Sequence, residues 1–289
     1  MNTVWSKHVQ GINTLYLSRK LRFDARFSEQ YRSLFRLDPH RQYRILEIGC
    51  GPGALAGVLH RWYPCAEITA LDRDSAFLDF ARSHEPGITF LEGDATCLPF
   101  EAQSFDVTVS YTLQEHVEPA AFWGEQHRVL KPGGVCLCLS ARKGIRQLAP
   151  CLETTEAERI FWAEQPDAEQ EFETWQVCRF PCSEAQLPAA MEAHGFRNVS
   201  TGYVVSDLTP DDPKYSAPMA EAMIEAERQN DLEAVRSTDS PRTEQICELV
   251  NAKYDERLRL YRAGEKQWDA SVSLTMIVRG VKAPDGAGG

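Results

Sequence analysis

Residues 45–53 read ILEIGCGPG, an apolar run that carries one acid, Glu47, and then meets three glycines at alternate positions. The apolar part is typical of a buried strand, and the ALAGVLHRWY that follows has helical spacing. Glycine at such a strand-to-helix turn permits a sharp bend and lets a ligand approach the backbone closely. The stretch therefore predicts a nucleotide-like ligand at the first turn of an α/β domain.

Two residues of this stretch oppose a pyrophosphate ligand. Pro52 has no N–H to offer to a phosphate oxygen. The Glu47 carboxylate would repel a pyrophosphate, whereas it would attract an ammonium group. Gly49, Gly51 and Ala54 still fit the loose dinucleotide pattern, so an NAD-linked oxidoreductase remains an alternative.

Acidic residues also follow the next two strand-like segments. Asp72 ends EITALD about 20 residues past the glycines, where a carboxylate can accept hydrogen bonds from both ribose hydroxyls. Asp94 follows ITFLEG, where it would accept a hydrogen bond from an adenine amino group. An adenosine joined to an ammonium, with no need for phosphate, matches S-adenosylmethionine.

The order of segments predicts the fold class. Strand-like and helical segments alternate from Arg44 to Ser140, which favours a doubly wound, Rossmann-like, mostly parallel sheet with helices on both faces. A strand-like SVSLTMIVRGV comes very late, at 271–281, and we expect it to be an antiparallel last strand. The charged segment before it, which has helical spacing, is then predicted to be an insertion between two neighbouring strands of the sheet.

The expected organisation has five parts. They are an N-terminal lid of two helices over 1–39, a cofactor-binding core over 40–206 with a helical substrate-side insertion at 142–182, a helical insertion over 207–270, the last core strand over 271–283, and a tail at 284–289.

Composition excludes several classes of partner. The 289 residues carry 31 basic and 42 acidic side chains, a net charge of −11, so the basic footprint of a nucleic-acid-binding protein is missing. No apolar run approaches the ~18 residues of a membrane span, and the first residues lack the apolar segment of a signal peptide. Nine irregularly spaced cysteines argue against a disulfide framework and predict a reducing, cytoplasmic location.

Five motifs carry a family resemblance: ILEIGCGPG, ALDRD, LEGDATCLPF, SFDVTVSYTLQEHV and VLKPGGVCLCLS. With them, about residues 42–140 resemble the class I S-adenosylmethionine-dependent methyltransferases, in the broad type 11-like group that acts on small molecules. The resemblance implies an enzyme that moves a methyl group to a small-molecule acceptor by in-line displacement and releases S-adenosylhomocysteine. A regulatory protein that binds the cofactor without turnover, and a macromolecular acceptor, are alternatives.

The resemblance also implies cofactor contacts, position by position. The methionine end would be held by Glu47, Gly49, Cys50 and Gly51, with the backbone of Tyr111 near its amine; the ribose would be held by Asp72, next to Arg73; and the adenine would be flanked by Asp94 and Ala95.

Further candidates lie at the edges of these motifs or outside them. Tyr16 and Arg19 would close over the cofactor carboxylate, or else pack as ordinary helix residues. His116 is either a general base or a pocket wall. Substrate contacts are expected from Gln114, Arg142, Trp162 and Trp175, with Arg142 facing an anionic group.

The sequence leaves the roles of two other features open. Cys178 and Cys182 have a spacing that suits a soft metal, but no further ligand pair is near in sequence, so we predict no metal site. The amphipathic helices of 207–270 are surface helices, a lid, or a homodimer element.

Overall fold

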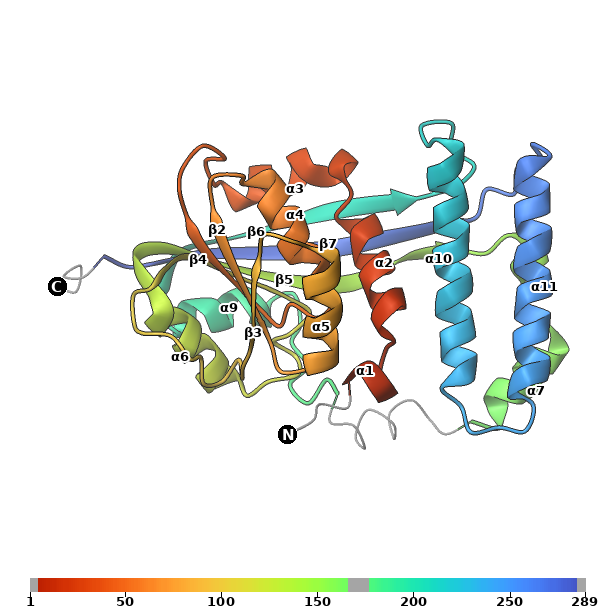
Figure 1. Ribbon diagram of the computed structural model, residues 1–289, viewed down its shortest axis with the longest axis horizontal. Coiled ribbons are helices and arrows are strands. Elements are labelled where there is room, and N and C mark those ends of the chain that lie inside the picture. Colours follow the sequence, from red (N-terminus) through yellow and green to blue (C-terminus); the bar gives the residue numbers. More distant parts are fainter. Residues whose placement is uncertain (1–4, 166–176, 285–289) are drawn as a thin grey trace.

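A seven-stranded sheet forms the centre of the computed structural model, which describes residues 5–165 and 177–284 (Figure 1). The strand order is β3-β2-β1-β4-β5-β7-β6. Strands β1 to β5 pair in parallel, and β7 is antiparallel to both β5 and β6. The strands are β1 Arg44–Ile48, β2 Glu67–Asp72, β3 Thr89–Glu92, β4 Phe105–Tyr111, β5 Leu130–Gln147, β6 Phe196–Leu208 and β7 Ala270–Lys282. The predicted fold class is confirmed, including the late antiparallel strand.

Helices cover both faces of the sheet. Along β1, Ile45 belongs to one buried cluster, whereas Leu46 and Ile48 belong to the other. Since side chains alternate along a strand, this is the pattern of a strand buried on both sides. The first cluster packs against α3 Ser28–Phe35, α4 Ala54–Trp62 and α5 Ser75–His84, and the second against α6 Pro119–Val129 and α9 Gln186–Ala193.

The N-terminal segment has more elements than the two predicted helices. It contains α1 Trp5–His8, α2 Ile12–Arg22, one 3-10 turn and α3. The Asp24 side chain accepts a hydrogen bond from the Arg26 amide at 3.1 Å, which starts the 3-10 turn and separates α2 from α3. Tyr31 and Phe35 of α3 are fully buried in the first cluster, so α3 belongs to the core and only α1 and α2 have the position of a lid.

Strand β5 is much longer than the expected 134–140. It continues to Gln147 because its second half pairs with β7, from Arg142 opposite Leu274 to Gln147 opposite Ala270. Residues 142–147 read RKGIRQ and have no apolar alternation, so the signal for this extension lies in its partner strand. The predicted start of a helical insertion at 142 is therefore wrong for residues 142–147, which are strand.

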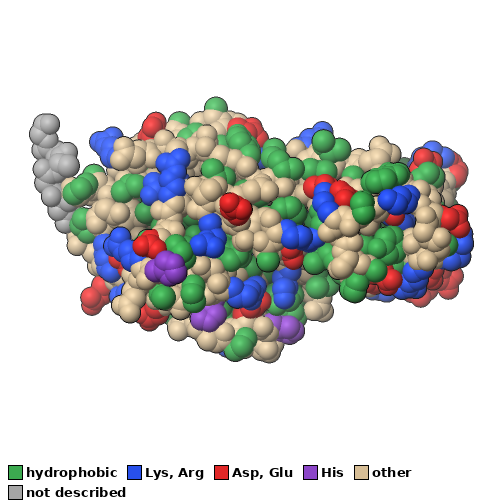
Figure 2. All heavy atoms as spheres, turned by 90° about the horizontal axis from the view of Figure 1, so that it is seen from above, with side chains coloured by type: hydrophobic (Ala, Val, Ile, Leu, Met, Phe, Trp, Pro, Cys, Tyr) green, Lys and Arg blue, Asp and Glu red, His purple; other side chains and the backbone are tan. Residues whose placement is uncertain are grey.

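The long strands carry the helical insertion at one end of the molecule. Helices α10 Ala217–Arg236 and α11 Thr243–Arg262 come between β6 and β7 and stand side by side (Figure 1). With α7 Glu156–Ala163 they share a third buried cluster. The fully buried Arg257 joins α11 to the ends of the neighbouring strands, through Asp211 at 2.9 Å and through Asp269. Acidic and basic side chains are interspersed over this end (Figure 2).

Candidate active site

The glycine loop after β1 uses its amide groups inside the protein. The amides of residues 49 and 50 both donate to the Leu71 carbonyl oxygen, at 2.8 and 3.0 Å, and the Gly53 amide donates to the carbonyl of residue 50 at 3.1 Å. The Gly51 amide donates to Asp72 Oδ2 at 2.7 Å, and Pro52 has no N–H. A phosphate cradle needs amides aimed at the ligand. In this loop none remains for that purpose.

Two of the glycines keep space open above the loop. Gly49 has a φ of 72°, and a Cβ there would lie 2.8 Å from a methyl carbon of Leu113. Gly51 has a φ of 53°, and a Cβ there would lie 2.9 Å from Arg19 Nη1. The bare backbone thus permits the left-handed turn and lets Arg19 lie directly over the loop.

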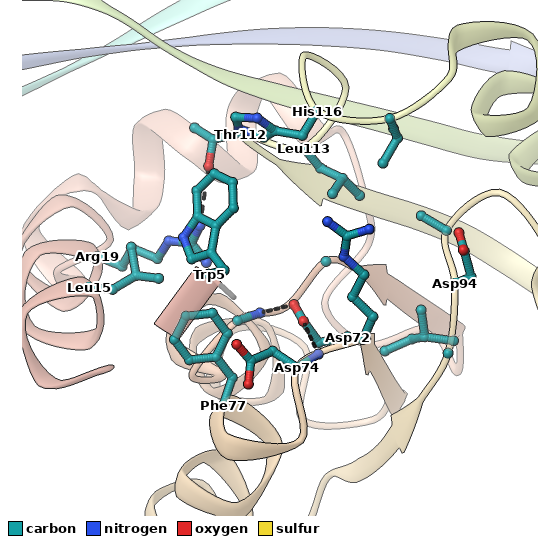
Figure 3. A pocket seen from close by; sticks show the side chains of 17 residues that line it. Trp5, Leu15, Arg19, Asp72, Asp74, Phe77, Asp94, Thr112, Leu113 and His116 are labelled. Atoms are coloured by element: carbon teal, nitrogen blue, oxygen red, sulfur yellow. Dashed lines mark hydrogen bonds between the residues drawn. The ribbon is translucent and has the colours of Figure 1, made fainter. Parts of the chain in front are cut away.

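A pocket opens at the carboxyl ends of β1, β2, β3 and β4 (Figure 3). It holds about 660 Å³ of space, counting open solvent at its mouth. Its walls bring together predicted residues from five separate segments of the chain, namely Arg19, Gly49, Gly51, Asp72, Arg73, Asp94, Ala95 and His116.

Glu47 belongs to β1, just before the glycine loop; it is fully buried and is not among the residues that line the pocket. Within the described part of the chain neither of its carboxylate oxygens has a hydrogen-bond partner. Burial and the Asp72 charge raise the pKa of this carboxyl to about 8, although the Arg19 charge and the nearby Ala56 amide act in the opposite direction. An unsatisfied buried carboxylate is costly, so its presence indicates a missing cationic partner.

Arg19, from α2, supplies the opposite charge at the same end of the pocket. Its guanidinium donates to the carbonyl oxygen of residue 50 at 3.4 Å and to Thr112 Oγ1 at 3.2 Å. Burial lowers its pKa, and the charges of Tyr111, Glu47 and Asp72 oppose that shift. A guanidinium beside an unpaired carboxylate is a suitable pair for the carboxylate and ammonium of an amino acid.

Asp72 and Asp94 stand at the ends of neighbouring parallel strands. Asp72 accepts hydrogen bonds from the amides of Gly51 and Asp74, and burial raises its pKa despite these bonds. Asp94 is more exposed; burial raises its pKa, but hydrogen bonds from the Thr96 hydroxyl and amide outweigh this and lower it overall. Both acids line the pocket, as the ribose and adenine assignments require.

Helix α1, from the segment expected to be an N-terminal lid, contacts the pocket at two points. The Ser6 amide donates to Asp74 Oδ2 at 3.1 Å, and the Trp5 ring meets the His116 ring edge to face with centroids 4.6 Å apart. Trp5, Asp74 and Phe77 line the pocket and were not predicted. Only Asp74 had a recognisable signal, since an Asp before a helix is a preferred N-cap.

The surroundings of His116 favour the pocket-wall interpretation. Its Nδ1 accepts a hydrogen bond from the Cys178 amide at 3.0 Å, so the proton of the neutral ring sits on Nε2. Burial lowers its pKa to about 4, with the Arg73 and Arg19 charges acting in the same direction. In this arrangement neither ring nitrogen is free to take a proton from a substrate.

The remaining candidates are not among the residues that line this pocket. Cys50 and Tyr111 are buried, and the Tyr111 hydroxyl accepts a hydrogen bond from Arg22 at 3.1 Å. The Tyr16 hydroxyl donates to Glu85 at 2.8 Å, and Tyr16 is not among the lining residues. Trp162 is 42% exposed on α7. Trp175 lies outside the described residues.

A second pocket lies beside the first. Its lining includes Gln114 and Arg142, both predicted substrate contacts, together with Cys178 and Cys182. Among residues 5–165 and 177–284, no group of three potential metal-ligating side chains occurs.

Comparison with known proteins agrees with this geometry. Residues 46–138, from β1 to β5, match the family model described as a methyltransferase domain. This chain contains a methyltransferase domain of the class I, S-adenosylmethionine-dependent type. The domain match covers the glycine loop, both strand-end acids and His116, and it ends before the helical insertion.

Relatives of the methyltransferase domain are found among curated proteins. One is a probable phthiotriol/phenolphthiotriol dimycocerosates methyltransferase from Mycobacterium ulcerans, 40% identical over 40% of this chain and 43% of its own length. Another is a fatty-acid O-methyltransferase from Mycolicibacterium smegmatis, 39% identical over 34% of this chain and 37% of its own length. The chain thus spans less than half the length of the curated relatives it matches.

A solved structure extends the likeness of fold beyond the methyltransferase domain. Phosphoethanolamine N-methyltransferase 2 from Haemonchus contortus, in complex with phosphomonomethylethanolamine and S-adenosylhomocysteine, superposes with a TM-score of 0.54. The alignment covers 97% of this chain and 60% of that one at 16% identity. At this identity the likeness concerns the fold alone.

Proposed function

We propose that this protein is an enzyme that transfers the methyl group of S-adenosylmethionine to a small-molecule acceptor. One observation carries the proposal: a buried, unpartnered Glu47 and the Arg19 guanidinium lie at a glycine loop whose amides are all paired internally. This combination suits a ligand that ends in an amino acid. It disfavours a ligand that presents a pyrophosphate to this loop, as the NAD of an oxidoreductase would.

The residues divide the cofactor between them. Glu47 and Arg19 would hold the ammonium and the carboxylate of its methionine end, and Gly49 and Gly51 would admit it to the backbone. The Asp72 carboxylate would accept hydrogen bonds from the ribose hydroxyls in addition to those from the backbone amides that it already binds. Asp94 would accept one from the adenine amino group.

The bound cofactor supplies a methyl group that its sulfonium already activates. The protein's contribution is therefore mainly to align the acceptor and to exclude water. Helix α1 serves the second task, because Trp5 and Ser6 contact opposite sides of the pocket, at His116 and Asp74. A side-chain base at His116 is not needed for this chemistry.

Turnover can be tested with S-adenosylmethionine and a panel of amine, hydroxyl, thiol and carbon acceptors, with release of S-adenosylhomocysteine as the readout. We expect release with at least one class of small acceptor. Asp72→Ala should lower it about 10–150-fold at low cofactor concentration, whereas Asp79→Asn, at an exposed position on α5, should not change it. Tight cofactor binding with no release for any acceptor would instead favour a regulatory protein without turnover.

The same proposal includes the protein's partners and location. In the described residues no helix is both long and apolar enough to cross a membrane. We propose a small-molecule acceptor, a cytoplasmic location and a homodimer through α10 and α11. Light scattering tests the dimer: a mass near twice 32.6 kDa supports it, and a mass near 32.6 kDa contradicts it.

A further inference from the structure

The second pocket lies on the far side of the segment that connects β4 to α6. Residues of this segment alternate between the two pockets: Thr112, Leu113, His116 and Val117 line the cofactor pocket, whereas Gln114 and Glu115 line the second one. The second pocket has about 440 Å³ of space, counting open solvent at its mouth. The two pockets therefore share this segment as a wall, and Glu115 Oε1 lies 3.9 Å from Nε2 of His116, at the border of the cofactor pocket.

Arg142 presents unused hydrogen-bonding capacity to the second pocket. Its Nη1 donates to the Cys182 carbonyl oxygen at 2.8 Å, and its Nε lies 3.5 Å from Glu184 Oε1 without forming a hydrogen bond. Nη2 has no hydrogen-bond partner in the described part of the chain, although the side chain is only 14% exposed. A buried guanidinium edge without a partner indicates an absent acceptor group, such as a carboxylate or phosphate.

Glu115, which also lines the second pocket, has an unpaired carboxylate oxygen that complements the unpaired nitrogen of Arg142. Its Oε2 is buried and, among the described residues, has no hydrogen-bond partner. Burial raises the pKa of this carboxyl, while the charges of Arg142 and Arg19 oppose the shift. Glu115 and Arg142 thus interact electrostatically, but they form no direct salt bridge within the described residues, so each can serve a different end of one ligand.

We propose that the second pocket is the acceptor subsite and that it takes a small molecule bearing an amine at one end, held by Glu115, and a carboxylate or phosphate at the other, held by Arg142. This inference rests on the proposed methyl transfer, because it concerns the acceptor of that reaction. Binding both ends at once satisfies the two buried groups and needs no net change of charge in the pocket.

Calorimetry on the full chain saturated with S-adenosylhomocysteine tests the proposal. The two-ended probes are O-phosphoethanolamine and β-alanine, and the one-ended probes are ethanolamine and acetate. We expect at least one two-ended probe to bind ~10-fold or more tightly than either one-ended probe. Which of the two it is distinguishes a phosphate from a carboxylate.

Matched variants assign the two ends. In Arg142→Met, the two-ended probe should bind no more tightly than ethanolamine. In Glu115→Gln, the two-ended probe should bind no more tightly than acetate. Arg146→Met, on the same strand but paired with Glu227 and Asp231 at the surface, should change neither preference. Unchanged binding of S-adenosylhomocysteine in each variant shows that the fold and the cofactor pocket are intact.

The outcomes separate this inference from the proposed function. If S-adenosylhomocysteine binds but ethanolamine binds as tightly as both two-ended probes, or no probe binds, the subsite assignment is overturned and methyl transfer stands. If S-adenosylhomocysteine itself does not bind, the proposed function fails first. If Arg142→Met leaves the preference intact, the anionic end is not held by Arg142 and the proposal is overturned.

Discussion

The Gly51 amide donates a 2.7 Å hydrogen bond to Asp72 Oδ2, so the acid at the end of β2 holds the loop that follows β1. The same carboxylate accepts the Asp74 amide through its other oxygen, at 2.9 Å. Asp72 therefore has a structural task in addition to the ribose contact proposed for it, and its removal affects both sides of the cofactor pocket.

Asp72→Ala should weaken S-adenosylhomocysteine binding by roughly 1.5–3 kcal/mol, the scale of hydrogen bonds to a charged group. This corresponds to a dissociation constant about 10–150 times larger in calorimetry. Asp79→Asn is the control, because Asp79 is an exposed acid one helical turn into α5. An unchanged dissociation constant for Asp72→Ala would rule out the ribose assignment.

The pKa of about 8 for Glu47 makes cofactor binding dependent on pH. An ammonium group binds the ionised carboxylate, so below pH 8 binding must release a proton from Glu47. Affinity should then rise nearly tenfold from pH 6 to pH 7, more gradually to pH 8, and level off above pH 8. A guanidinium such as that of Arg19 is not deprotonated in proteins, and the raised pKa of Asp72 would add to the rise.

Calorimetry at several pH values, in buffers of different ionisation enthalpy, measures this proton release. Glu47→Gln should bind more weakly at pH 8 and lose the slope. Glu67→Gln, an exposed acid at the start of β2, should keep it. A flat profile for the unaltered protein would contradict the Glu47 assignment.

His116→Ala should reduce kcat by less than ~10-fold, because Nδ1 is engaged by the Cys178 amide and a positioned general base is usually worth more than that. The pKa of about 4 also means that no ionisation of His116 should shape the rate between pH 5 and 8. A ~100-fold loss of kcat with unchanged cofactor affinity would restore His116 as the base.

Gly53→Ala should lower the free energy of unfolding by about 2–4 kcal/mol, from left-handed backbone strain and from overpacking. Gly53 has a φ of 83°, and a Cβ there would lie 2.8 Å from the Ala81 Cβ. Gly124→Ala is the control: Gly124 lies within α6 with no atom within 4 Å of the added Cβ, so about 0.5–1 kcal/mol of stabilisation is expected. Urea denaturation compares the two, and equal midpoints would show that the loop tolerates a side chain.

The fold was predictable where one stretch of sequence contains its own signal. ILEIGCGPG identifies a buried strand and its glycine turn, and Asp72 and Asp94 follow from the strands that precede them. The second half of β5 was not predictable, because RKGIRQ becomes a strand only through pairing with β7. Trp5 could not be placed over His116 for the same reason: the contact joins segments more than 100 residues apart.

The residues proposed to bind the acceptor were likewise only partly predictable from the sequence. Arg142 could be chosen because it closely follows Ser140, where the strand was expected to end, but its unpaired Nη2 and the matching Oε2 of Glu115 are visible only once the chain is folded. Trp162 was chosen for its aromatic ring, yet it is largely solvent-facing while its neighbour Phe161 enters the helical cluster. Residue type alone does not tell which of two adjacent aromatics is buried.

Calorimetric titration of the unaltered protein with S-adenosylhomocysteine and, separately, with NAD⁺ tests most directly whether the glycine loop receives an amino acid joined to adenosine. We expect saturable one-to-one binding of S-adenosylhomocysteine and no measurable heat from NAD⁺ at the same concentrations. Saturable binding of NAD⁺ with no signal from S-adenosylhomocysteine would contradict the account.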